Sequence, residues 1–323
     1  MNRLRVVFTV LALMLCCGTA FVAYTSASGR RISITDVAIA TDTRTDSGRQ
    51  IVRLSAAGEE TEADIILPLP EDVHFEHLSF ENRYMTKELL VRMETDAAHF
   101  YEGIAIPCDT DKVTGVRSVY TAASRTLDLS FQTEEILEPQ VQVEEGEVRV
   151  MLEIPANTHK TVAVLDPAYL DTSDSALRLA RAVSEKAAAS GDGLRVYLTR
   201  SDVYPASEEA CLRLTKDVSA DRFLRLEVFD EGPLVATAYF HDGFFLRGYG
   251  NAELATDAEL QLSGIAGLSA EGVMATQDAF ALSSLKIPAA TLRLTGLSGS
   301  EETIDAAAEA IYHSLLSGQE GNE

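Results

Sequence analysis

Residues 198–230, LTRSDVYPASEEACLRLTKDVSADRFLRLEVFD, contain the pattern from which the fold of the second half of the chain can be inferred. An apolar strand pattern ends in the pair Thr199 and Arg200, and the segment SEEACLRLTKDV that follows has helical spacing of its apolar residues. The pair Ala220 and Asp221 then precedes a second strand pattern, RFLRLEVF. A strand, a helix and a strand in this order predict parallel strands of one sheet.

The same alternation continues on both sides of this stretch, from TVAVLD to the terminal helical pattern EETIDAAAEAIYHSLL. It predicts an α/β domain over residues 160–318, with a mostly parallel sheet and helices on both faces. Ligands of such sheets bind beyond the carboxyl ends of the strands. Asp166, Thr199, Glu227 and Arg293 all fall near predicted strand ends, so we expect them to share one cleft.

Three segments of this half carry a resemblance to a known family. They are the stretch above, the segment TVAVLDPAYLD at residues 161–171, and the segment KIPAATLRLTGLSGSEE at residues 286–302. Together they resemble the zinc-dependent N-acetylmuramoyl-L-alanine amidases, which cut the peptide stem from peptidoglycan glycan strands. The positions that keep the family's pattern are Asp166, Pro167, Ala168, Thr199, Arg200, Asp202, Ala220, Asp221, Phe223, Pro288, Ala289, Leu294, Leu297 and Ser298.

The positions that should carry the chemistry of that family hold other residues. The resemblance places Tyr169 where the first zinc-binding histidine would be and Glu227 where the last one would be, and it places Arg293 where the catalytic glutamate would be. The segment for the second ligand is missing, because the turn leads almost directly into a predicted helix at residues 173–189. A tyrosine phenol stays protonated at neutral pH, a lone glutamate holds zinc weakly, and an arginine cannot act as a base. We therefore predict no zinc cofactor and no hydrolysis.

Histidines and cysteines offer no substitute metal site or disulfide framework. Two of the six histidines, His74 and His77, lie three apart on a predicted strand, and the other four are isolated. Outside the apolar N-terminal segment only Cys108 and Cys211 remain, one in each half. A disulfide between Cys108 and Cys211 would join the two halves and stays open. The alternative is that Cys211 is a small buried apolar residue.

Composition limits the class of protein. With 323 residues, of which 46% are hydrophobic, the chain is long enough for two ordered cores. Its formal net charge of −23 opposes binding to nucleic acid, which depends on Lys and Arg meeting phosphates. We expect no nucleic-acid partner.

The N-terminus has the layout of a secretory signal or membrane anchor at residues 1–28. Arg3 and Arg5 precede an apolar run, VVFTVLALMLCCGTAFVAY, of a length that can span a bilayer. We expect an extracytoplasmic protein that is anchored in the membrane or secreted to the cell wall, and we favour the anchor.

The first half, residues 32–155, consists of short alternating segments such as ISITDVAIA, ELLVRME and EVRVMLEI. These predict an all-β, sandwich-like domain of antiparallel strands, and a linker at residues 155–160 ends it. Residues 115–131 and 147–154 resemble the AMIN modules that localise amidases. Five aromatic residues could line a glycan-binding face, although their spacing is more typical of core positions; they are Phe75, Phe80, Tyr84, Phe100 and Tyr101.

The sequence thus predicts a cell-envelope protein that keeps the frame of an amidase as a pseudoenzyme. It would bind peptidoglycan or regulate an active amidase or division partner through a vestigial cleft of Asp166, Tyr169, Glu227 and Arg293. Within that cleft we expect Glu227 and Arg293 to form an ion pair in place of the metal. Two alternatives stay open: an active peptidoglycan amidase with a rearranged metal site, and a structural envelope spacer. The rearranged site would use Asp166, Asp171, Asp174 and Glu227 as ligands, although Asp171 and Asp174 would more simply cap the helix that follows.

Overall fold

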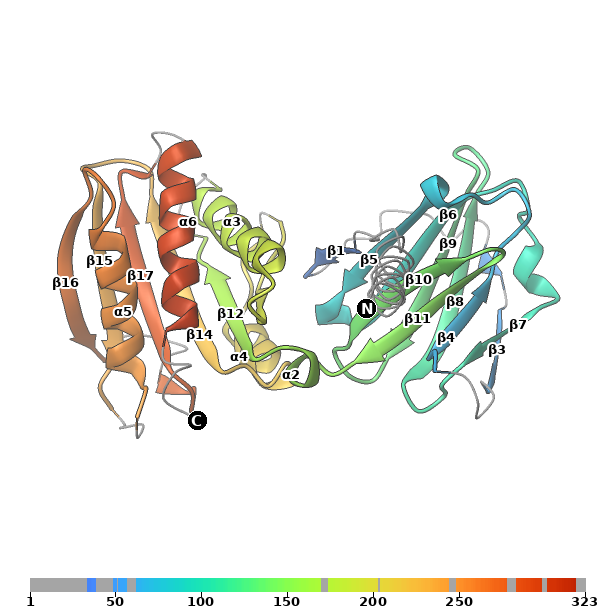
Figure 1. Cartoon of the computed structure of the whole chain (residues 1–323), viewed down its shortest axis with the longest axis horizontal. Coiled ribbons are helices and arrows are strands. Elements are labelled where there is room, and N and C mark those ends of the chain that lie inside the picture. Colours follow the sequence, from blue (N-terminus) through green and yellow to red (C-terminus); the bar gives the residue numbers. More distant parts are fainter. Residues whose placement is uncertain are drawn as a thin grey trace, which may run out of the picture.

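A computed structural model describes residues 34–38, 49–50, 52–56, 62–169, 174–202, 204–243, 248–277, 283–297 and 301–317. They form an N-terminal β part, residues 34–153, and a C-terminal α/β part, residues 161–317 (Figure 1). The predicted signal or anchor at residues 1–28 lies outside the described residues. None of the helices in the described ranges is long and apolar enough to cross a membrane.

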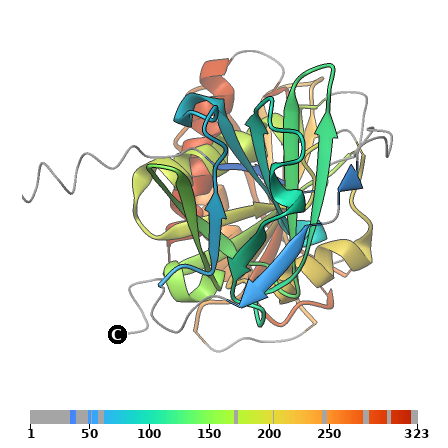
Figure 2. The ribbon, with the colours of Figure 1, turned by 90° about the vertical axis from the view of Figure 1, so that its right-hand side faces the viewer.

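Two sheets make up the N-terminal β part. The first has the strand order β1-β5-β6-β9-β8-β2 and the second β10-β11-β4-β7-β3. Viewed end-on, both stand in front of the C-terminal part (Figure 2). Their bounds are β1 (Ile34–Val37), β2 (Arg49–Gln50), β3 (Arg53–Ala56), β4 (Ile65–Pro68), β5 (Leu78–Arg83), β6 (Glu88–Glu94), β7 (Ala105–Cys108), β8 (Val113–Thr121), β9 (Thr126–Thr133), β10 (Glu138–Glu144) and β11 (Glu147–Glu153).

One apolar core joins the two sheets. Phe80 and Phe131 come to it from the first sheet, and Ile65 and Val150 come from the second. Every second residue of each strand faces this core, which is why the alternating segments of the sequence form a two-sheet structure. The pairings β1–β5 and β3–β7 are parallel, so the predicted purely antiparallel arrangement is wrong at these two edges.

Several local predictions in this part need correction. Residues Phe75–His77 form a 3-10 turn, so His74 and His77 do not lie on a strand. The sequence analysis did not predict β7, β8 and β10 as strands. Among the aromatic residues, Phe80, Tyr84 and Tyr101 are buried, as expected of core positions.

The C-terminal part contains one sheet of order β13-β12-β14-β17-β15-β16. Neighbouring strands are parallel except β15 and β17, which are antiparallel. The predicted mixed α/β structure is therefore confirmed. The bounds are β12 (Thr161–Pro167), β13 (Leu194–Leu198), β14 (Arg222–Phe229), β15 (Val235–His241), β16 (Ser269–Thr276), β17 (Ala289–Thr295), α3 (Ser175–Ser190), α4 (Glu208–Asp217), α5 (Asn251–Ser263) and α6 (Glu301–Leu316).

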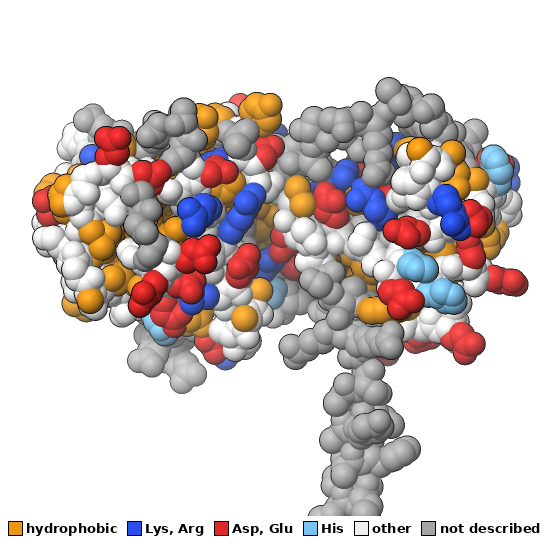
Figure 3. All heavy atoms as spheres, turned by 90° about the horizontal axis from the view of Figure 1, so that it is seen from above, with side chains coloured by type: hydrophobic (Ala, Val, Ile, Leu, Met, Phe, Trp, Pro, Cys, Tyr) orange, Lys and Arg blue, Asp and Glu red, His pale blue; other side chains and the backbone are white. Residues whose placement is uncertain are grey.

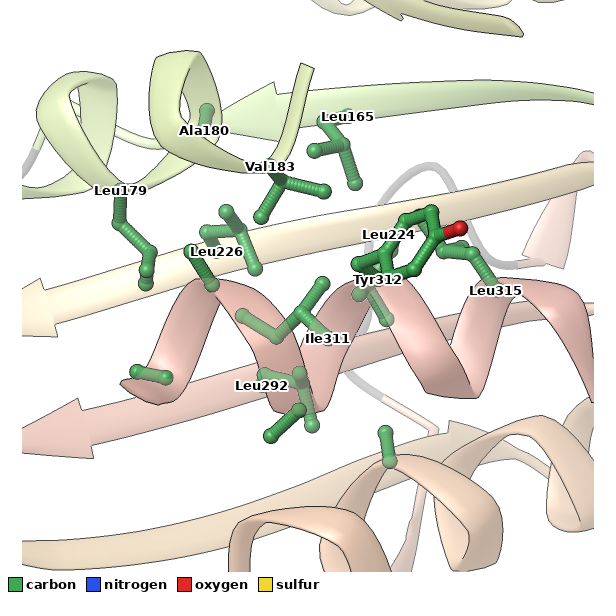
Figure 4. Close-up of a cluster of buried hydrophobic side chains, with 14 of the residues drawn as sticks. Leu165, Leu179, Ala180, Val183, Leu224, Leu226, Leu292, Ile311, Tyr312 and Leu315 are labelled. Atoms are coloured by element: carbon green, nitrogen blue, oxygen red, sulfur yellow. The ribbon is translucent and has the colours of Figure 1, made fainter. Parts of the chain in front are cut away.

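Helices α3, α5 and α6 cover one face of this sheet. Figure 4 shows Val183 of α3 and Ile311 of α6 meeting Leu224 and Leu226 of β14 in a shared apolar cluster. Helix α4, which begins after the N-cap Ser207, lies on the opposite face and belongs to a different cluster. Helix α4 covers this second face beside β12 and β13. Toward the ends of β14 and β17 the same face carries charged side chains.

Three features of this part differ from what the sequence analysis described. The edge strand β16 was not expected, and the linker contains a short helix, α2 (Pro155–Thr158). Asp174 stands at the N-cap position of α3, but its carboxylate makes no capping hydrogen bond there. It lies instead 3.4 Å from Nη1 of Arg200. The role of Asp171, the other proposed cap, lies outside the described residues.

The two parts meet through a buried contact. Tyr84 and Ile136 of the β part pack in one cluster with Val164, Tyr197 and Leu214 of the α/β part. Burial of such apolar surface stabilises the contact by about 25 cal/mol per Å². The β part therefore lies directly against the edge strand β13 and helix α4.

Candidate functional site

The residues that carry the family pattern hold the ends of the strands together. Asp221 accepts a hydrogen bond from the N–H of Val162 at 2.8 Å and donates its own N–H to the carbonyl of Val162 at 2.7 Å. This double contact fixes the start of β14 against β12.

The Thr-Arg pair does the same at the other end of β12. The hydroxyl of Thr199 donates to Asp166 at 2.6 Å, and Nε of Arg200 donates to the carbonyl of Pro167 at 2.6 Å. Nη1 of Arg200 also donates to the carbonyl of Asp202 at 2.6 Å. These motif residues have structural partners, so their presence requires no metal.

Four charged side chains alternate in sign across the ends of β12, β14 and β17, and we call them the charge ladder: Asp166, Arg225, Glu227 and Arg293. Arg225 donates to Asp166 at 2.8 Å and lies 3.5 Å from Glu227. Arg293 donates to the same Glu227 oxygen through Nη2 at 2.7 Å and through Nε at 3.0 Å. The expected ion pair between Glu227 and Arg293 is present because the two residues are direct partners in the parallel register of β14 and β17.

The ladder buries its carboxylates and exposes its guanidinium groups. The side chains of Asp166 and Glu227 are 6% and 15% exposed, against 27% for Arg225 and 45% for Arg293. The hydrogen bond to Glu227 raises the pKa of Arg293 above its ordinary value. Acidic and basic side chains lie next to each other at this end of the molecule (Figure 3). The guanidinium groups of the ladder therefore lie nearer the surface, where they can donate hydrogen bonds, and the carboxylates that neutralise them lie beneath.

Two aromatic rings flank the outer arginine. The guanidinium carbon of Arg293 lies 5.0 Å from the ring centroid of Tyr239 and 6.0 Å from that of Phe229. Its Nη1 is 3.4 Å from the hydroxyl of Tyr239. Such contacts restrict the guanidinium and attract it electrostatically, so it is held in place beside an aromatic surface.

Tyr169 does not join the ladder through any contact in the described residues. Its side chain is exposed just beyond β12, and its ring centroid lies 5.7 Å from the guanidinium carbon of Arg200. Of the four predicted cleft residues, the structure links Asp166, Glu227 and Arg293 through Arg225.

Sequence analysis missed two residues at this site. Arg225 links the two carboxylates, and its position two residues before Glu227 on the same strand face could have revealed it. Cys211 of α4 places its sulfur 3.6 Å from Asp166. Burial and the neighbouring Asp166 raise the pKa of this thiol to about 12, so it is uncharged at neutral pH.

The residues present do not fit a catalytic zinc ion. Such a site needs three ligands from His, Glu, Asp or Cys around an open position. Within the described ranges no three residues of these types are grouped so that they could hold a metal. Two guanidinium groups instead neutralise the only two carboxylates of the ladder, and a cation there would be repelled by both.

Comparisons with known proteins find similarity to solved structures over about half of the chain. No family model and no curated protein matches the sequence. The chain is similar to the N-acetylmuramoyl-L-alanine amidase AmiC2 of Nostoc punctiforme, with 18% identity, a TM-score of 0.42 and coverage of 49% of this chain and 97% of that one. It is also similar to the N-acetylmuramoyl-L-alanine amidase of Clostridium difficile 630, with 16% identity, a TM-score of 0.44 and coverage of 50% and 98%. At these identities the likeness concerns the fold.

Proposed function

We propose that this protein is a cell-envelope pseudoenzyme that binds peptidoglycan without hydrolysing it. The binding surface is the charge ladder with its flanking aromatic rings. The observation that carries the proposal is the ion pair between Glu227 and Arg293, which stands at the two positions where the resembled family has a zinc ligand and a catalytic carboxylate.

The chemistry of the ladder favours an anionic, hydroxylated ligand. Its exposed groups are the guanidiniums of Arg225 and Arg293, and guanidinium forms paired hydrogen bonds with carboxylates. Peptidoglycan stem peptides carry carboxylates, and their glycan strands carry hydroxyls. The rings of Phe229 and Tyr239 beside Arg293 add apolar surface for a sugar or peptide face.

The contacts of the carboxylates weigh against an active amidase with a rearranged metal site. Asp166 already bonds Thr199 and Arg225, and Glu227 bonds Arg293. To bind a metal, each carboxylate would have to lose a charge-assisted hydrogen bond. Asp174 contacts Arg200 instead of the ladder.

The location follows from the same proposal. A peptidoglycan ligand requires an extracytoplasmic site, which agrees with the signal or anchor predicted at residues 1–28. In this arrangement the β part at residues 32–155 serves as the AMIN-like domain that holds the α/β part, residues 160–318, near the wall.

A sedimentation assay with purified, insoluble peptidoglycan tests the proposal. The wild-type protein is expected to sediment with the polymer, and Arg293→Met is expected to reduce the bound fraction because it removes an exposed donor. Arg149→Met is a matched control, since Arg149 is also ion-paired on a strand and its side chain is 44% exposed. Thermal unfolding checks that both variants fold.

Two outcomes would overturn the proposal. One is equal sedimentation of wild type, Arg293→Met and Arg149→Met, which would place binding elsewhere. The other is stoichiometric zinc in the purified protein together with release of stem peptides that a chelator abolishes, which would identify an active amidase.

A further inference from the structure

A groove of about 420 Å³ lies between the two parts of the chain, away from the charge ladder. Its floor is the edge strand β13, one wall is the C-terminal half of α3, and the other wall is formed by β1 and β10. This volume is within the range of about 300–1,000 Å³ that is common for ligand sites, which often lie between domains.

The outer edge of β13 faces this groove. Among the described strands β13 pairs with β12 alone, and the N–H of Thr199 points inward to the carbonyl of Leu165. Backbone direction alternates along a strand, so the N–H and C=O groups of Leu198, Val196 and Leu194 point outward.

The outward-pointing backbone groups of β13 differ in their hydrogen-bond partners. At Leu198, the hydroxyl of Tyr84 donates to the carbonyl at 2.5 Å and accepts from the N–H at 3.1 Å. At Val196, within the described part, only the hydroxyl of Ser184 approaches the carbonyl, at 3.5 Å. Val196 and Leu194 line the groove but are each only 3% exposed, so only a small part of each residue meets its open space. Buried backbone groups are nearly always hydrogen-bonded, and these two residues offer the alternating donors and acceptors that an added strand would satisfy.

The groove is also acidic. The carboxylates of Asp36 and Glu138 share one guanidinium, that of Arg195, at 2.9 Å and 2.6 Å. Two negative charges therefore face one positive charge. Asp36 is the more accessible carboxylate, with 36% of its side chain exposed, so it can meet a further cation.

We propose that this groove binds an extended peptide segment of a partner protein, which adds as a strand to the outer edge of β13 and places a basic side chain against Asp36. The backbone of the peptide pairs with Leu194 and Val196. The small residue Ala188 on α3 leaves room for its side chains.

Hydrogen exchange of the full-length protein in detergent tests this inference, with the blocked peptide acetyl-Val-Lys-Val-Ala-amide as the probe. When the peptide concentration is about ten times its dissociation constant, exchange of the Leu194 and Val196 amides is expected to slow about tenfold. The same peptide with methylated backbone nitrogens is expected to give no slowing. A version with glutamate in place of lysine is expected to bind more weakly.

Two variants make the test specific to the groove. Ala188→Phe fills the groove and is expected to abolish the slowing. Ala189→Phe places the same ring one residue along on an equally exposed position that does not line the groove, and it is expected to change nothing. Absence of slowing in the wild type, or equal slowing in both variants, would overturn the proposal. Equal binding of the lysine and glutamate peptides would overturn the role of Asp36. Neither result depends on peptidoglycan binding.

Discussion

The hydroxyl of Tyr84 takes the place of a missing strand beside Leu198, because it bonds both backbone groups of that residue across 114 positions of sequence. The ring also packs edge-on against Tyr197, with centroids 5.0 Å apart. One side chain of the β part thus completes the hydrogen bonding at one end of β13 and contributes to the apolar contact between the parts.

Tyr84→Phe is expected to destabilise the protein. The ring would remain, but the N–H and carbonyl of Leu198 would lose their partner in a buried place. Leaving such groups unsatisfied costs about 1–3 kcal/mol. Urea unfolding of the variant should show this loss. Tyr204→Phe is the control, because Tyr204 is 70% exposed and its change should stay within about 0.5 kcal/mol. Equal effects of the two substitutions would contradict the role of Tyr84.

Cys211 is expected to resist alkylation in the folded protein. Burial, together with the charge of Asp166, raises the pKa of its thiol to about 12, and the thiolate is the reactive form. Mass-spectrometric mapping after iodoacetamide treatment at pH 8 should find Cys211 modified only when the protein is unfolded.

Asp166→Asn provides the matched test of that electrostatic contribution. The substitution removes a negative charge 3.6 Å from the sulfur, so the thiol pKa should fall and alkylation should become faster. Rapid alkylation of Cys211 in folded wild-type protein would contradict this account.

Which strands the sequence revealed depended on their composition. β12 is buried along its whole length, and its apolar run was recognised. The edge strand β16 consists mostly of small and polar residues on a partly exposed edge, and β10 alternates Val with Gln and Glu. Such composition carries little strand signal.

The contacts of the candidate site were also predictable only in part. The ion pair between Glu227 and Arg293 could be predicted because adjacent parallel strands place residues of known strands in register. The contact of Tyr84 with Leu198 could not, because it depends on how the two parts dock, and no local pattern encodes that. The two-residue period of a strand could have placed Arg225 on the same face as Glu227. Its contacts with both Asp166 and Glu227 depend on the twist of the sheet and on side-chain geometry, which the sequence does not show.

The ion pair of Glu227 and Arg293 is expected to contribute modestly to stability. Because 45% of the Arg293 side chain is exposed, solvent screens the pair, and a double-mutant cycle of Glu227→Gln and Arg293→Met should give a coupling of about 0.5–1 kcal/mol in urea unfolding. Arg149 and Glu147, whose side chains are 44% and 30% exposed, form the reference pair. Additive effects of the two ladder substitutions would contradict a direct interaction.

His159 at the end of the groove is expected to make stability fall as the pH decreases through about 6.5. Burial lowers the pKa of His159 below its ordinary value of 6.5; the positive charge of Arg195 acts in the same direction, and Glu138 opposes it. Below pH 6.5 the unfolded chain therefore binds a proton at this residue that the folded chain does not yet bind, and the free energy of unfolding decreases. The loss ends once the pH is below the folded-state pKa. His159→Gln removes this contribution, so the wild-type protein should lose more stability than the variant between pH 7.5 and 5.5 in urea unfolding. Because carboxylates contribute equally in both proteins, the difference isolates His159, and identical pH profiles would contradict the assigned direction of its pKa.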